Sequence, residues 1–149
     1  MNKGLRIYII GAGAIGLSIA WRLLQRGASV TVFERDRVGA GSSSAAGGML
    51  APTAEVDFEE TRLLELGQNS LELYPGFVSE LEDKTGESLG YLEEGTIVVA
   101  VDRDEAEQLE RLNQYHERLG LDARRLAGAE FKKLEPSLSP ELHAGLFLS

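Results

Sequence analysis

Apolar positions in the first third of the chain follow two different periods. Residues 5–10 are almost continuously apolar, which predicts a strand of a covered sheet. In the residues that follow, apolar side chains recur every four positions, as they do on one face of a helix. Gly27 is expected to end that helix. Residues 30–33 are again apolar, so the order predicts a βαβ unit with parallel strands. Three helical residues are predicted to face the sheet: Ile15, Ile19 and Leu23.

A glycine-rich turn joins the first strand to the helix. Gly11 allows a sharp turn, Gly13 leaves room for a pyrophosphate against the backbone, and Gly16 lets the helix lie close to the strand. The free N–H groups and dipole of the helix N-terminus favour phosphate there. Glu34 follows the second strand, where a carboxylate can accept hydrogen bonds from ribose hydroxyls and would repel a 2′-phosphate. The spacing predicts a dinucleotide-binding unit. The alternative is a structural βαβ unit that binds no ligand.

Small residues dominate the segment 39–52, where a dinucleotide-binding fold would usually continue with another helix and strand. Its three serines are expected to cap a short helix, and they could hold a second phosphate-bearing part of the ligand. Gly47 and Gly48 would let a flat ring approach the backbone, and the Met49 side chain that follows them is soft and polarizable. A flexible linker is the alternative. The residues concerned are Ser42, Ser43, Ser44, Gly47, Gly48 and Met49.

The βαβ unit and the stretch Ala46-Gly-Gly-Met-Leu-Ala-Pro52 together resemble the N-terminus of the FAD-dependent D-amino-acid oxidase family, and within it the glycine oxidases. The resemblance implies FAD as the cofactor. By position, the pyrophosphate loop is Gly11, Ala12, Gly13, Ala14, Ile15 and Gly16; the ribose end is Glu34 and Arg35; the second phosphate segment is Ser42, Ser43 and Ser44; and the flavin-ring stretch is Gly47, Gly48 and Met49.

The fold implied by this resemblance is α/β: a Rossmann-like, glutathione-reductase-like FAD-binding βαβ unit followed by the start of an inserted α+β substrate domain. We expect residues 1–57 to be the N-terminal part of the FAD-binding domain. Residues 58–149 are expected to hold a helical segment and the start of a substrate or cap domain. Because the chain stops directly after an apolar run, we expect it to be the N-terminal portion of a longer protein.

Patterns in the second part predict alternating helices and strands. A helix is predicted over 58–84 with a kink or break at Pro75-Gly76, and a hairpin over 91–101. Asp102 is expected to cap a helix that ends at Gly120, with Glu105 completing an approximate capping box. The apolar stripe of that helix is predicted to be Ala106, Leu109, Leu112 and Leu119. A strand at 123–126, a short helix at 129–134 and an apolar run at 146–148 follow.

Composition narrows the choice of partners. A formal net charge of −9 disfavours nucleic acid and anionic membrane surfaces, and the absence of cysteine excludes thiolate chemistry and disulfides within these 149 residues. His116 and His143 have no metal-like spacing, so both are expected to be solvated surface histidines and no metal is assigned. No signal peptide or transmembrane span is recognised, and a cytoplasmic location is expected.

No residue of the chain is assigned a catalytic role. In the family that it resembles, the arginine and tyrosine that hold the substrate carboxylate lie beyond residue 149. Six arginines and tyrosines in charged helical or turn contexts are expected to be surface residues: Arg62, Arg103, Arg111, Arg124, Tyr91 and Tyr115.

The resemblance implies FAD-dependent oxidation of glycine, or of another small amine or amino acid, to an imine, with oxygen as acceptor and a role in thiamine biosynthesis. Sarcosine oxidases, D-amino-acid dehydrogenases and flavin enzymes for glycerol phosphate or hydroxy acids remain alternatives within the class. A non-catalytic nucleotide-binding fragment and an NAD-dependent dehydrogenase are the alternatives outside it. A small-molecule substrate is the expected partner. Whether the complete protein forms a homo-oligomer is left open by the sequence.

Overall fold

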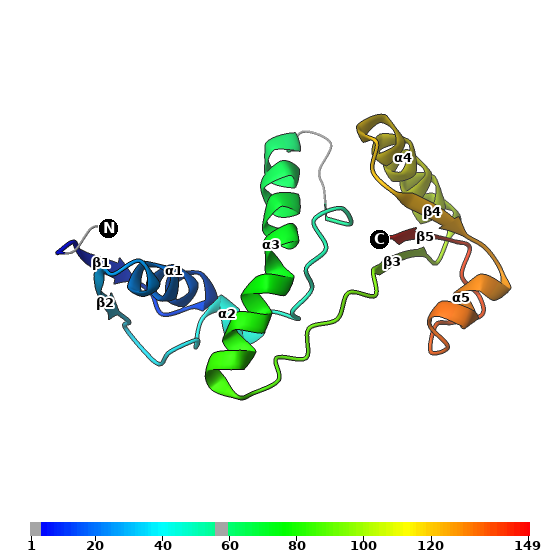
Figure 1. The fold of residues 1–149 in the computed structure, drawn as a ribbon. Coiled ribbons are helices and arrows are strands. Elements are labelled where there is room, and N and C mark those ends of the chain that lie inside the picture. Colours follow the sequence, from blue (N-terminus) through cyan, green and yellow to red (C-terminus); the bar gives the residue numbers. More distant parts are fainter. Residues whose placement is uncertain (1–3, 56–59) are drawn as a thin grey trace. The chain divides into compact units, whose positions relative to one another are not determined.

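The computed structural model describes residues 4–55 and 60–149 and contains both helices and strands, which confirms the α/β class (Figure 1). The chain divides into two compact units, Met1–Met49 and Leu50–Ser149. The predicted domain boundary at 57/58 and the predicted helix start at Phe58 lie outside the described residues. No helix among the described residues is long and apolar enough to span a lipid bilayer.

The first unit is built on the predicted βαβ arrangement. Strands β1 (Arg6–Ile10) and β2 (Ser29–Phe33) pair in parallel over their whole length. Helix α1 (Ala14–Gln25) connects them and packs on the sheet. Gly27 follows the helix with a φ of +81°, a left-handed conformation that glycine adopts without a Cβ penalty. The predicted unit and the end of its helix are confirmed.

Helix α1 turns a face of small residues to the sheet, as predicted for Gly16 but not for the isoleucines. Ala20 is buried, and a methyl group added at Gly16 would lie 3.4 Å from the Ile9 side chain. Ile15 and Ile19, in contrast, are 79% and 48% exposed. Small residues face the strands because they allow the helix backbone to approach the sheet closely. The prediction is therefore wrong for Ile15 and Ile19, while Leu23 is partly buried.

The second unit contains an antiparallel sheet of β3 (Thr96–Ala100), β4 (Ala123–Leu126) and β5 (Ala144–Leu148), with β5 in the middle. The predicted hairpin over 91–101 is wrong, because β3 pairs with β5 and residues 91–95 lie in no strand. Strand β4 and helix α5 (Ala129–Leu134) form where predicted.

Helix α4 (Arg103–Leu119) covers this sheet and has both predicted ends. The Asp102 carboxylate accepts a hydrogen bond from the Glu105 N–H at 2.9 Å, and Gly120 ends the helix with a φ of +68°. The Glu105 carboxylate accepts from Val101 N–H at 2.8 Å, one residue earlier than in a regular capping box. Leu109 joins Ala100, Leu146 and Leu148 in the core of the unit, and Ala106 and Leu112 pack against this cluster.

His116 corrects the prediction of a solvated histidine on α4. It is fully buried at 0% exposure, and Asn113, one turn earlier, is 2% exposed. The covered stripe of α4 therefore runs through Leu109, Asn113 and His116, while Leu119 of the predicted stripe is 39% exposed. His143 is exposed, as predicted.

Helix α3 (Thr61–Thr85) continues through Pro75, so of the two predicted alternatives, a kink or a break, the break is wrong. Proline removes one backbone hydrogen bond, but the helix has a buried residue on each side of it. Leu64 before Pro75 and Val78 after it are both buried at 6% exposure.

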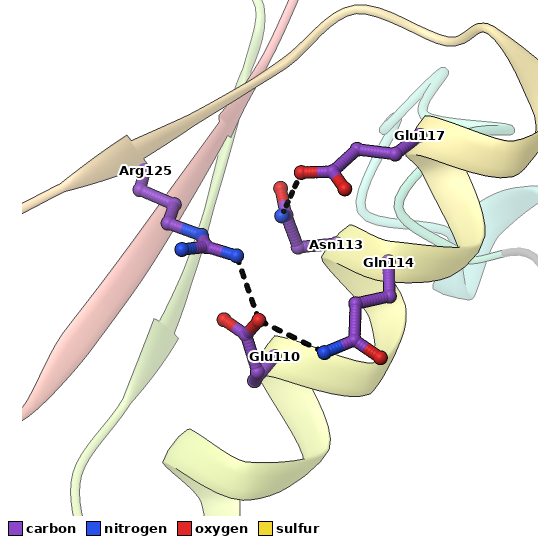
Figure 2. A network of polar contacts seen from close by, with 5 residues as sticks. All are labelled: Glu110, Asn113, Gln114, Glu117 and Arg125. Carbon is purple, nitrogen blue, oxygen red and sulfur yellow. Dashed lines mark hydrogen bonds and ion pairs between the residues drawn. The ribbon is translucent and has the colours of Figure 1, made fainter.

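A polar network links α4 to β4 (Figure 2). The Arg125 guanidinium donates to the Glu110 carboxylate at 2.6 Å, and the Gln114 amide donates to the same oxygen at 3.1 Å. The Asn113 amide donates to Glu117 at 2.7 Å. Since the Arg125 and Glu110 side chains stay 61% and 44% exposed, their ion pair contributes at most about 1 kcal/mol. This network belongs to the packing of the second unit and carries none of the predicted chemistry.

Candidate functional site

The glycine-rich turn of the first unit has the geometry of an anion-binding loop. Gly11 leaves β1 with a φ of +99°, and its N–H donates to the Phe33 carbonyl at 2.7 Å, which fixes the loop on β2. A methyl group at Gly16 would overlap the Gly11 carbonyl oxygen, so only glycine fits at this close approach of helix and strand. In the first turn of α1 the Ala14 N–H donates to the Ser43 hydroxyl, whereas the N–H groups of Ile15 and Gly16 have no carbonyl partner within the helix and can donate to a ligand.

Glu34 follows β2 and reaches back to the loop. One carboxylate oxygen accepts from the Ala12 N–H at 2.8 Å, and the other accepts from the N–H groups of Arg35 and Asp36 at 2.8 and 3.1 Å. The bonds from Ala12 and Asp36 lower the pKa of the Glu34 carboxyl below its ordinary value. The exposed group is therefore ionised at neutral pH, and the oxygen that binds Ala12 keeps one lone pair that can accept a hydrogen bond from a ribose hydroxyl.

The serine segment forms the short helix α2 (Ser42–Ala45) beside the loop. The Ser43 hydroxyl accepts a hydrogen bond from the Ala14 N–H at 2.8 Å, across 29 residues of sequence. Ser44 donates to the carbonyls of Ala40 and Gly41. The serines therefore lie inside the helix and do not cap it, because Gly41 holds the cap position without a side-chain bond. Because Ser43 bonds the loop, this part of the segment is not a free linker.

Not every predicted site residue is brought together. Within the described part of the chain, the hydrogen bonds join Ala12, Ala14, Glu34 and Ser43, and they do not extend to Ser42 or to the stretch 47–49. Gly47, Gly48 and Met49 are exposed, Met49 at 71%, and Arg35 is exposed beside Glu34.

Sequence reasoning missed one residue of this site. The Gly39 N–H donates to the Ala12 carbonyl at 2.9 Å, and Gly39 has a φ of +74°. The sequence signal for this contact is a glycine three residues before Ser42.

The residues present fit a dinucleotide cofactor. The Ser43 hydroxyl that accepts from Ala14 still has its own hydrogen to donate to a phosphate oxygen. The loop offers backbone donors and no side chain at Gly13, where a Cβ would lie 3.0 Å from the Ser43 hydroxyl oxygen. Glu34 supplies an acceptor for the ribose end.

Comparison with known proteins decides the family. Residues 6–149 match the family model described as FAD dependent oxidoreductase. The chain belongs to this family of FAD-dependent oxidoreductases. FAD is thus its cofactor, as the resemblance implied, and an NAD-dependent dehydrogenase is disfavoured.

Similar proteins include glycine oxidases. The chain is 34% identical over 139 residues to the glycine oxidase of Geobacillus kaustophilus, an alignment that covers 93% of this chain and 37% of that protein. It is 36% identical over 154 residues to a putative thiamine biosynthesis oxidoreductase, ThiO, of Rhizobium etli, with coverages of 96% and 40%.

The fold comparison agrees. The crystal structure of glycine oxidase from Geobacillus kaustophilus matches with a TM-score of 0.89 at 32% identity, over 97% of this chain and 39% of that one. The chain therefore spans about two fifths of the length of these relatives. The resemblance to the D-amino-acid oxidase family and its glycine oxidases is confirmed.

Proposed function

We propose that this protein oxidises glycine, or another small amine or amino acid, to an imine, with FAD as cofactor and oxygen as electron acceptor. The observation that carries the proposal is the likeness to glycine oxidase over nearly the whole chain. The similarity to a putative thiamine biosynthesis oxidoreductase supports a role of the imine product in thiamine biosynthesis.

We propose the following division of roles for the first unit. The loop Gly11–Gly16 and Ser43 hold the pyrophosphate, and Glu34, followed by Arg35, holds the adenosine ribose. Ser42 and Ser44 complete the phosphate side, and Gly47, Gly48 and Met49 lie along the flavin ring. The Ser43–Ala14 hydrogen bond supports the first assignment, and the low pKa of Glu34 supports the second.

When bound, FAD supplies the acceptor for a hydride from the substrate carbon–hydrogen bond. The chain's own contribution in this proposal is to bind and orient the cofactor through backbone donors and one carboxylate. We keep as a proposal the organisation expected from sequence, with 1–57 as the start of the FAD-binding domain and 58–149 as the start of a substrate domain. The presence of two compact units supports two domains, although these units divide between Met49 and Leu50. We also propose a cytoplasmic location and a small-molecule partner.

Two measurements test this proposal. Titration of the purified protein with FAD, followed by flavin fluorescence and repeated with excess NAD, should show binding that NAD does not displace. The FAD-bound protein should then consume oxygen and release peroxide with glycine.

The choice of substrate separates the alternatives. Faster turnover of sarcosine than of glycine would indicate a sarcosine oxidase, and turnover of D-amino acids with an artificial acceptor but not with oxygen would indicate a dehydrogenase. FAD binding without turnover of any of these substrates would refute the proposed activity and favour a nucleotide-binding module.

A further inference from the structure

Ala12 lies inside the glycine loop, and its backbone is held from both ends. Its N–H donates to the Glu34 carboxylate at 2.8 Å, and its carbonyl accepts a hydrogen bond from the Gly39 N–H at 2.9 Å. Ala12 is buried, whereas Glu34 is exposed and Gly39 is partly buried. The chain that follows β2 therefore fixes the loop through two separate contacts, one from a side chain and one from the backbone.

The segment that begins at Gly39 meets the loop a second time at Ser43. The Ala14 N–H, which has no carbonyl partner within α1, donates to the Ser43 hydroxyl at 2.8 Å. The residues between these two contacts are themselves folded, since the Ser44 hydroxyl donates to the Ala40 carbonyl at 3.1 Å. The segment and the glycine loop therefore form a closed ring of backbone and hydrogen bonds.

Closure of this ring depends on the backbone conformation of Gly39. Its φ is +74°, in the left-handed region where a residue with a Cβ is strained. A Cβ would meet nothing within 4 Å, so conformation and not space selects glycine here. The angle φ sets the direction of the following chain relative to the N–H that points at Ala12. A residue that relaxes to a negative φ therefore keeps the bond to Ala12 only by turning Ser43 away from the loop.

We propose that Gly39 is a positioning residue for the pyrophosphate side of the FAD site, where its left-handed backbone places the Ser43 hydroxyl on the Ala14 N–H. This inference rests on the proposed function, in which the loop and Ser43 hold the pyrophosphate. Gly39 acts through Ser43, whose hydroxyl keeps its own hydrogen for a phosphate oxygen. Every contact used in this inference lies within the first unit.

The test compares the same backbone strain at two places in the first unit. Gly39→Ala and Gly27→Ala both put a Cβ on a left-handed residue with open space around it, so both should lower the urea midpoint of unfolding. Gly27 follows the C-terminus of α1, at the opposite end of that helix from the loop. Only Gly39→Ala should raise the Kd for FAD, by about tenfold. Gly39→Asn should bind FAD within about threefold of the wild type, because asparagine adopts the left-handed conformation more readily.

Amide hydrogen exchange, followed by NMR without cofactor, gives a second readout. Gly39→Ala should speed the exchange of the Ala14 amide, because the Ser43 hydroxyl moves away from it, whereas Gly27→Ala should not. In the wild type, the Ala14 and Gly39 amides should have protection factors that agree within about threefold, because one opening of the segment breaks both bonds. This comparison needs no variant to fold.

The outcomes separate this inference from the proposed function. Equal Kd values for FAD in Gly39→Ala and Gly27→Ala, or unchanged exchange of the Ala14 amide in Gly39→Ala, would overturn the positioning role and leave the proposed function intact. Wild-type protection factors that differ by more than about threefold would do the same. Failure of the wild type to bind FAD would instead overturn the proposed function, and the role of Gly39 with it.

Discussion

Gly16→Ala tests the glycine loop with the smallest substitution available. The added methyl group would overlap the Gly11 carbonyl oxygen and would lie 3.2 Å from the Gly11 carbonyl carbon. Both atoms belong to the backbone, so neither can rotate away as a side-chain tip would. The loop is then expected to shift off the helix N-terminus when no cofactor is bound, and FAD binding would have to force it back.

Overpacking of this kind typically costs roughly 1–3 kcal/mol. If FAD binding must force the relaxed loop back into the strained position, this energy is lost from the binding free energy. The Kd for FAD then rises by a factor of roughly 5 to 150. The assay is a fluorescence titration of the cofactor-free protein with FAD, with far-ultraviolet circular dichroism to confirm that the helices are retained.

Gly76→Ala is the matched control, because Gly76 also lies inside a helix and a methyl group there would meet nothing within 4 Å. It should leave the Kd unchanged and raise stability by about 0.5–1 kcal/mol. If Gly16→Ala binds FAD within about twofold of the wild type, a difference of about 0.4 kcal/mol, the close approach of loop and helix does not shape the site.

Four further predictions follow from contacts described above. Gly13→Val should abolish FAD binding by filling the pyrophosphate position, whereas Arg111→Ala should leave it unchanged in the same titration; equal effects would contradict the site assignment. Glu34→Gln should weaken FAD binding about tenfold through loss of charge-assisted hydrogen bonds, and calorimetry should detect the change. Asp102→Ala removes the side-chain cap of α4 and should lower the free energy of unfolding by about 1 kcal/mol in urea; an unchanged midpoint would argue against the cap. Burial lowers the pKa of His116, so the unfolded chain binds a proton below about pH 6.5 while the native state stays neutral, and stability is therefore complete above that pH and falls on acidification. Urea denaturation at a series of pH values should show a weaker dependence in His116→Gln than in the wild type.

Local signals predicted the first unit well. The turn at Gly11, the helix end at Gly27 and the carboxylate at Glu34 each follow from the chemistry of a few neighbouring residues, and the structure has all three features in place. The same holds for the Asp102 cap. On α1 the close approach at Gly16 was predicted correctly. The apolar periodicity wrongly placed Ile15 and Ile19 against the sheet, because small residues occupy that face.

Errors in the second unit have a common cause in long-range packing. Buried His116 forms a hydrogen bond with a residue 63 positions earlier in the chain, a contact that no local pattern around the histidine could indicate. Its position, three and seven residues after Asn113 and Leu109, continues a helical stripe that a search confined to apolar residues overlooks. Strand β3 likewise pairs with a strand that the chain reaches only at Ala144–Leu148.

The strand order β3-β5-β4 has a consequence for synthesis on the ribosome. The middle strand of the sheet is the last of the three to be made, so β3 and β4 have no partner within this sheet while the intervening residues emerge. At translation rates of about 5–20 residues per second, this delay lasts on the order of seconds for β3. During that time its apolar residues Ile97, Val98 and Val99 depend on α4, on chaperones or on the ribosome surface for cover. Assembly of the second unit is therefore tied to the arrival of the final strand, whereas the βαβ unit has both of its strands long before.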